Sequence, residues 1–246
     1  MKLGAAIPVL NEWRFLPAVV HQMLKVVDRC VILRGTRSFS GDPVQLGPVP
    51  QLDKRVELVS GAWSGDNETR NAGMRILRDC RYVFLVDSDE IILDRELFQL
   101  RDVCRTDEPR LIGLQQHVYW KTPEYQVDPP PQGAVRMIWR NDLPVTGLRG
   151  GPANLFEVDA RYHHLSHART DREMVDKIRL TAHRDEIPCD WIDRVWRAWD
   201  RNRTMEDLHP TSPSFFKRVV HRPNSEILSL LDETGCDWSD LKKAVA

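Results

Sequence analysis

The chemically most suggestive stretch of the sequence is DSDE at residues 87–90. It follows YVFLV (residues 82–86), an unbroken apolar run typical of a strand buried on both faces. Asp87 and Asp89, at i and i+2, would therefore project from the carboxyl end of that strand. Mg²⁺ is held in proteins by one or two carboxylates together with substrate phosphates. The pattern favours a divalent-cation site for a phosphorylated ligand, while helix capping by the same aspartates stays open.

The elements that would position these carboxylates alternate along the first hundred residues. Apolar runs predict strands at residues 2–7, 30–33, 56–59 and 82–86, and helical spacing predicts helices at 16–27 and 67–79. This alternation predicts an α/β domain with a mostly parallel sheet. Ligands of such sheets bind at the carboxyl ends of the strands. Asn11, Glu12 and Arg34 follow two other strands, so they are expected at the same edge as Asp87 and Asp89.

The second half of the chain has a different pattern. We expect strands at residues 111–119, 133–139 and 161–166, a proline-rich loop between the first two, and helices at 170–183, 191–199 and 225–231. Three tryptophans in the second of these helices are more typical of a core than of a ligand platform. No linker is evident, so we expect one domain, with a core over residues 1–168 and a C-terminal helical extension over 169–246.

Composition limits the classes of protein. The chain has 246 residues, is 41% hydrophobic and carries a net charge of −1, which excludes wholesale disorder and gives no overall attraction to nucleic acid or anionic lipid. No apolar run approaches the ~20 residues of a membrane span. The N-terminus lacks the features of a signal peptide, and five scattered cysteines favour a reducing compartment. A cytoplasmic location, in a bacterial cell or a phage-infected host, is expected.

Three motifs in register carry a family resemblance: IPVLNE (residues 7–12), ETRNAG (68–73) and VFLVDSDE (83–90). Over residues 2–90 the chain resembles the nucleotide-sugar half of glycosyltransferase family 2, in particular its small soluble bacterial and bacteriophage members. The resemblance implies a GT-A-like, Rossmann-type sheet flanked by helices. It also implies a donor half at residues 1–90 and an acceptor half at 91–168.

The resemblance further implies a metal-dependent transfer of a hexosyl or pentosyl group from a nucleotide-sugar to a hydroxyl, with inversion. The donor-binding residues would be Pro8, Leu10, Asn11, Glu12, Arg34, Arg70, Asp87, Ser88 and Asp89. Asp89 would bind Mn²⁺ or Mg²⁺ together with His164, and His167 is the second choice for that ligand. Arg169 or Lys177 would add positive charge near the leaving diphosphate.

One departure from the family concerns the donor's base. Arg34 and Arg37 stand where the family has an acidic residue that contacts the base. The resemblance therefore does not identify the base, and a UDP-sugar is expected only as the default donor. For the catalytic base, Asp142 ranks first, ahead of Glu124, Asp128 and Glu157.

The acceptor and the reaction class have alternatives. A soluble glycan is the first expectation for the acceptor, and a hydroxylated pyrimidine in phage DNA the second, with the arginines of residues 136–203 tracking phosphates. A non-catalytic nucleotide-sugar-binding protein of the same fold is the first alternative function. A nucleotidyltransferase is the second, although the segment after the first strand lacks the glycine-rich loop of that class.

Overall fold

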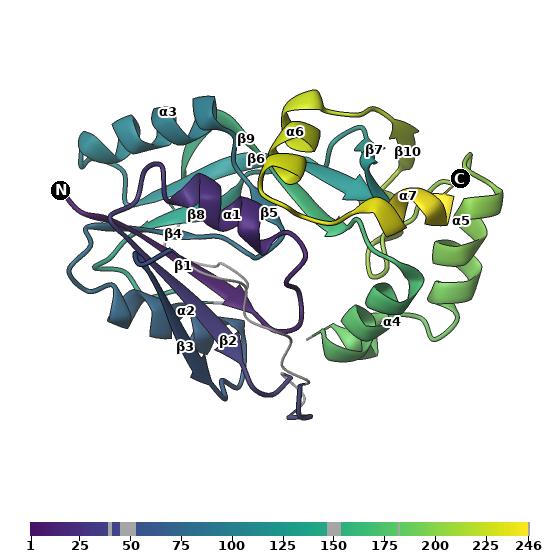
Figure 1. The fold of residues 1–246 in the computed structure, drawn as a ribbon, viewed down its shortest axis with the longest axis horizontal. Coiled ribbons are helices and arrows are strands. Elements are labelled where there is room, and N and C mark those ends of the chain that lie inside the picture. Colours follow the sequence, from purple (N-terminus) through teal and green to yellow (C-terminus); the bar gives the residue numbers. More distant parts are fainter. Residues whose placement is uncertain (39–40, 45–52, 147–153, 182, 246) are drawn as a thin grey trace. The chain divides into compact units, whose positions relative to one another are not determined.

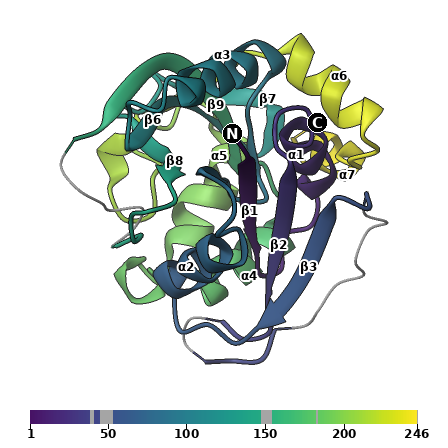
Figure 2. The same ribbon diagram turned by 90° about the vertical axis from the view of Figure 1, so that its left-hand side faces the viewer.

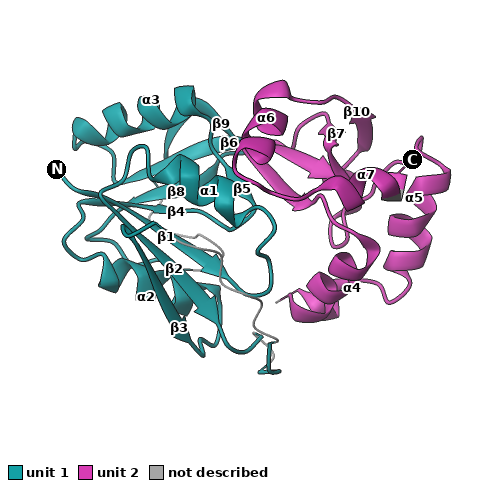
Figure 3. Cartoon of the chain, in the orientation of Figure 1, with its two compact units in different colours: residues 1–115, 133–162 teal, residues 116–132, 163–246 magenta. Residues whose placement is uncertain are grey.

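The computed structural model describes residues 1–38, 41–44, 53–146, 154–181 and 183–245. They form two compact units, one of Met1–Gln115 with Gly133–Tyr162 and one of Gln116–Gln132 with His163–Ala246 (Figure 3). Two long strands, β6 (Leu111–Trp120) and β9 (Phe156–His167), contribute residues to both units. This division differs from the boundaries expected after residues 90 and 168, because continuous strands instead of linkers join the units.

The first unit is built on a mixed sheet (Figure 1). Its four parallel strands lie in the order β3 (Val56–Gly61), β2 (Arg29–Gly35), β1 (Leu3–Val9) and β4 (Tyr82–Leu85). Strand β8 (Val135–Arg140) continues the sheet antiparallel to β4 and pairs with the first residues of β6. The expected α/β class, a mostly parallel sheet flanked by helices, is confirmed in this unit.

Helices cover both faces of this sheet (Figures 1 and 2). Helix α2 (Asp66–Ile76) lies on one face, and α1 (Leu16–Met23) and α3 (Asp94–Arg105) lie on the other. Pro17 is in the first turn of α1, where its missing N–H leaves no hydrogen bond unmade. The short strand β5 (Glu90–Ile91) precedes α3.

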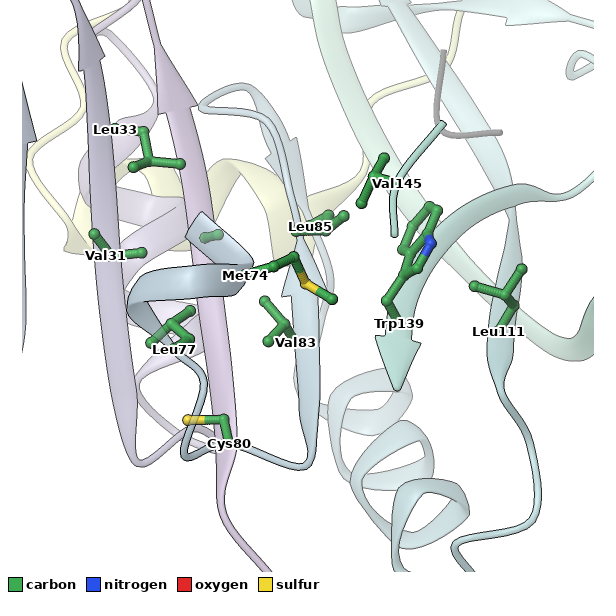
Figure 4. Packing of buried hydrophobic residues seen from close by; sticks show 11 residues of the cluster. Val31, Leu33, Met74, Leu77, Cys80, Val83, Leu85, Leu111, Trp139 and Val145 are labelled. Atoms are coloured by element: carbon green, nitrogen blue, oxygen red, sulfur yellow. The ribbon is translucent and has the colours of Figure 1, made fainter. Parts of the chain in front are cut away.

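The core beneath α2 joins the parallel and antiparallel parts of the sheet (Figure 4). Met74 of α2 and Leu77, the residue that follows the helix, lie over alternate residues of the strands. The full cluster consists of Ala6, Val31, Leu33, Met74, Leu77, Cys80, Val83, Leu85, Leu111, Trp139 and Val145. Side chains at intervals of two along a strand share one face, so the intervening residues of β1, β2 and β4 belong to the face of α1.

The second unit combines antiparallel strands with the C-terminal helices. Strand β7 (Thr122–Asp128) pairs with the end of β6 and with β10 (Arg218–His221). The remaining elements are α4 (Asp171–Leu180), the short helices η1 (Arg184–Glu186) and η3 (Pro213–Phe215), the π-helical η2 (Ile192–Arg197), α5 (Ala198–Arg201), α6 (Ser225–Glu233) and α7 (Ser239–Val245). No helix among the described residues is long and apolar enough to cross a membrane.

Tryptophans form the core of this unit. The Trp120 ring centroid lies 4.9 Å from that of Trp196, 6.1 Å from that of Trp191 and 6.3 Å from that of Trp199. All four side chains are buried, which confirms the expected core role. Lys121 is buried beside them: its Nζ lies 3.9 Å from the Trp196 ring centroid and 2.8 Å from a carboxylate oxygen of Asp200.

Strand β7 stands where the prolines of the sequence predict a loop. Pro123 lacks an N–H, yet it falls at an irregularity of the ladder, between the pairs Tyr119↔Gln126 and Trp120↔Thr122. The missing donor therefore leaves no paired position unsatisfied.

Candidate functional site

The carboxylates after β4 form a compact turn. The Glu90 amide donates to the carbonyl of Asp87 at 3.0 Å, and the Asp87 amide donates to a carboxylate oxygen of Glu90 at 2.7 Å. Ser88, Asp89 and Glu90 are buried, whereas 31% of the Asp87 side chain is exposed. Two reciprocal hydrogen bonds thus fix the turn at the carboxyl end of β4, where the sequence predicts it.

Arg70 of α2 holds this turn from the side. Its Nη2 donates to Oδ1 of Asp87 at 2.8 Å and lies 3.5 Å from Oδ2 of Asp66. The side chain is only 3% exposed, and its Nε and Nη1 make no hydrogen bond to any described residue. A buried guanidinium with unmet donors is costly in a protein without an anion or water beside it. Arg70 therefore touches Asp87, whereas the sequence predicts a contact with a phosphate or a sugar.

The neighbours of Arg70 in the ETRNAG motif explain its position. The Asn71 side chain donates to the carbonyl of Val145 at 2.8 Å and accepts from its amide at 3.0 Å. A Cβ on Gly73 would lie 2.6 Å from the Cβ of Ala6, so only glycine allows α2 to lie this close to β1. The motif thus fixes how close α2, which carries Arg70, lies to the sheet and how the helix is rotated about its axis.

The end of β1 contributes the next part of the site. Pro8 pairs in register with Leu33, and Leu10 lies against Gly35, where a Cβ would be 2.7 Å from Leu10 Cδ1. Asn11 and Glu12 follow directly and are partly exposed. Since β1 and β4 are adjacent parallel strands, residues 8–12 and 87–90 follow the same edge of the sheet.

Asp142 lies at the other edge. It follows β8, which is antiparallel to β4 and pairs Arg140 with Tyr82, the first residue of β4. Both Asp142 carboxylate oxygens accept from Arg140, at 3.1 and 3.0 Å, and this ion pair lowers the pKa of Asp142. The structure does not bring Asp142 together with Asp87, and the glycine-rich segment after it lies outside the described residues.

The candidate histidines are close together on β9. His167 is buried, with its ring stacked on Trp120 at 5.5 Å between centroids, and its Nδ1 has no partner among the described residues. Burial, followed by the charges of Lys177, His209, His164 and Arg169, holds the pKa of His167 well below its usual value. His164, three residues earlier, is more exposed. His164, Arg169 and Lys177 therefore lie near the neutral imidazole of His167 and form one cluster with it.

His209, which the sequence indicates as a structural residue without a functional role, is a further member of this cluster. Its ring centroid lies 6.4 Å from that of His167 and 4.6 Å from that of Phe216. Its Nδ1 accepts from the amide of Ser212 at 3.0 Å, and burial lowers its pKa to about 4. The Leu-His-Pro string at residues 208–210 can be recognised in the sequence, but it does not predict that His209 lies beside His167 and Phe216.

The donors present suit a hard divalent cation in type. Asp87 and Asp89 offer carboxylate oxygens, but Oδ1 of Asp87 is already bonded to Arg70. No group of three or more His, Cys, Asp or Glu side chains able to hold a metal occurs in the described ranges. A cation here would thus need ligands from its substrate, as Mg²⁺ in phosphate-binding sites commonly has.

Comparisons with known proteins give a distant structural likeness. No protein-family model and no curated protein sequence matches the chain. The structure is similar to residues 1–349 of S. aureus TarS in complex with UDP-GlcNAc, with a TM-score of 0.44 and 11% identity over 73% of this chain and 65% of that one. A longer TarS chain gives 0.44 and 12% over 85% of this chain and 41% of that one. The chain spans less than two thirds of these TarS chains, and a likeness at this level assigns neither family nor function.

Proposed function

We propose that the protein transfers a sugar from a nucleotide-activated donor to a hydroxyl acceptor. The observation that carries the proposal is the buried turn of residues 87–90, fixed at the carboxyl end of a parallel strand. Beside it lies a buried arginine, Arg70, whose Nε and Nη1 have no hydrogen-bond partner among the described residues. A nucleotide diphosphate with its cation needs such acidic and cationic groups at one edge. The motif resemblance to glycosyltransferase family 2 supports the same reaction.

Each residue has a role within this proposal. Asp89 would hold Mn²⁺ or Mg²⁺, and the cation would neutralise the diphosphate that leaves. Arg70 holds Asp87 through a hydrogen bond, and Asp87 would contact the ribose and the cation's water shell.

The catalytic base in this proposal is a carboxylate other than Asp142. Asp128 is held by Arg218 at 2.7 Å and Arg222 at 3.3 Å, and the ion pairs lower its pKa. Within the described part of the chain, the carboxylates of the two remaining candidates, Glu124 and Glu157, form no ion pair or side-chain hydrogen bond. An inverting transfer needs one of them within hydrogen-bond reach of the acceptor hydroxyl.

A soluble glycan is the acceptor that we propose. The DNA alternative requires arginines of residues 136–203 to be available for phosphates. Several of these arginines already pair with carboxylates: Arg140 with Asp142, Arg179 with Asp176, Arg194 with Asp190, and Arg197 with Asp193 and Asp171. Retention on DNA at low salt would reverse this choice.

Thermal unfolding with a panel of nucleotide-sugars, with and without Mn²⁺, tests the proposal. Saturation at 100 times Kd would raise Tm by roughly 5–10 °C, and only when nucleotide and metal are both present. Release of the nucleoside diphosphate would then distinguish an enzyme from a binding protein. A panel without any Tm shift would refute the proposal.

A further inference from the structure

Arg34 lies at the carboxyl end of β2, at the same edge of the sheet as residues 8–12 and 87–90. It pairs in register with Val9 of β1 and with Ser60 of β3. Its neighbour Leu33 belongs to the cluster beneath α2. Adjacent residues of a strand point to opposite faces, so Arg34 lies on the face of the sheet opposite to α2.

The Arg34 side chain is anchored but forms no ion pair with a described residue. Its Nε donates to Oγ of Ser60 at 2.9 Å, and within the described ranges no carboxylate forms a salt bridge with it. Arg29, at the other end of the same strand, is paired with Asp79 at 2.6 Å and with Glu57 at 3.4 Å. Since arginine has five N–H donors in a rigid fork, anchoring through Nε leaves the two terminal nitrogens of Arg34 oriented for a ligand.

The topology places this fork beside a nucleotide site. From β1 the chain adds β2 and then β3 on one side, and it then returns to add β4 on the other side of β1. The switch point of the sheet therefore lies between β1 and β4. In open α/β sheets ligands bind at the switch point, and in dinucleotide-binding sheets of this kind a side chain about 20 residues after the first turn, near the end of the second strand, contacts the ribose. Arg34 has that position in this chain.

A guanidinium selects among bases because it donates hydrogen bonds and accepts none. Guanine presents two adjacent acceptors, N7 and O6, to such a fork. Cytosine likewise presents N3 and O2. Uracil places an N3–H donor between its two carbonyl oxygens, and adenine sets the N6 amino group beside N7, so neither offers an adjacent acceptor pair.

We propose that Arg34 is a specificity-determining residue that selects a guanosine or cytidine nucleotide over a uridine or adenosine nucleotide. The inference rests on the proposed function and replaces the default of a uridine donor.

Calorimetric titration with GDP, CDP, UDP and ADP in the presence of Mn²⁺ tests the inference. The wild-type protein should bind GDP or CDP about tenfold or more tightly than UDP and ADP. Arg34→Gln and Arg34→Lys, which both remove the fork, should abolish this preference. Arg29→Gln is the matched control on the same strand and should keep it.

The outcomes separate the two proposals. Equal affinities, a preference for UDP, or an equal loss for all four nucleotides in Arg34→Gln would overturn the selection by Arg34 and leave the proposed function standing. If the folded wild-type protein binds none of the four, the proposed function itself fails.

Discussion

Nη2 of Arg70 lies 2.8 Å from Oδ1 of Asp87, which joins helix α2 to the turn after β4. The two residues are 17 positions apart and belong to two motifs that the sequence shows separately. The contact between Arg70 and Asp87 brings the two motifs together in one site. It also means that Asp87 is oriented by a buried cation before any ligand binds.

Replacement of Arg70 by methionine should lower both stability and donor affinity. A hydrogen bond to a charged group contributes about 1.5–3 kcal/mol, and Asp87 would lose its buried partner. Urea unfolding measures the loss, and a double-mutant cycle with Asp87→Asn isolates the pair. Arg81→Met is the control, because its ion pair with Asp107 is exposed and worth about 1 kcal/mol or less. Equal losses in the two variants would show that the Arg70 contact contributes no more than a surface pair.

Gly73→Ala should destabilise the protein even though alanine favours helices. The new Cβ would lie 2.6 Å from the Cβ of Ala6, and overpacking of a core typically costs about 1–3 kcal/mol. Thermal unfolding provides the measurement. Gly65→Ala, where an added Cβ meets nothing within 4 Å, should change stability little. The double variant Ala6→Gly/Gly73→Ala should recover part of the loss, and no recovery would argue against the contact as its cause.

Much of the fold is predictable because local patterns determine it. The run at residues 82–86 is apolar throughout, and β4 is accordingly buried along its length. Strand β7 is not predictable in this way, because whether a proline fits a strand depends on which ladder position it occupies. The division into two units also has no local signal, since nothing in the sequence of β6 and β9 marks where they leave one unit for the other.

Stability should fall as the pH is lowered, partly because of His163. Its Nδ1 lies 2.8 Å from the Tyr119 hydroxyl, and burial lowers its pKa to about 3. In the unfolded chain the imidazole binds a proton below about pH 6.5. The contribution of His163 to the free energy of unfolding is therefore complete above about pH 6.5 and decreases as the pH falls toward 3. Between pH 7 and pH 5 the decrease is about 2 kcal/mol.

Urea unfolding at pH 7 and pH 5 checks this dependence. His163→Gln should show a smaller loss between the two pH values than the wild-type protein. His21→Gln, at an exposed position of α1, should retain the wild-type dependence. An unchanged dependence in His163→Gln would contradict the assignment.

The candidate site is predictable in its residue types and less so in its contacts. Residues 8–12 and 87–90 do share one edge, because the carboxyl ends of two adjacent parallel strands lie at the same edge of a sheet. A turn signal alone ranks Asp142 as the base, and the antiparallel direction of β8, which no local pattern reveals, places it at the opposite edge. The partner of Arg70 likewise depends on the packing of α2 against β1.

The decisive experiment on the cation site is calorimetry of the Mn²⁺-dependent affinity for a nucleoside diphosphate in Asp89→Asn, measured beside Asp142→Asn. We expect Asp89→Asn, with its fold intact, to lose at least about tenfold in affinity, because a hard cation needs the carboxylate. Asp142→Asn, at the far end of β4, should bind as the wild-type protein does. Unchanged metal-dependent affinity in Asp89→Asn would show that no cation is held by this carboxylate.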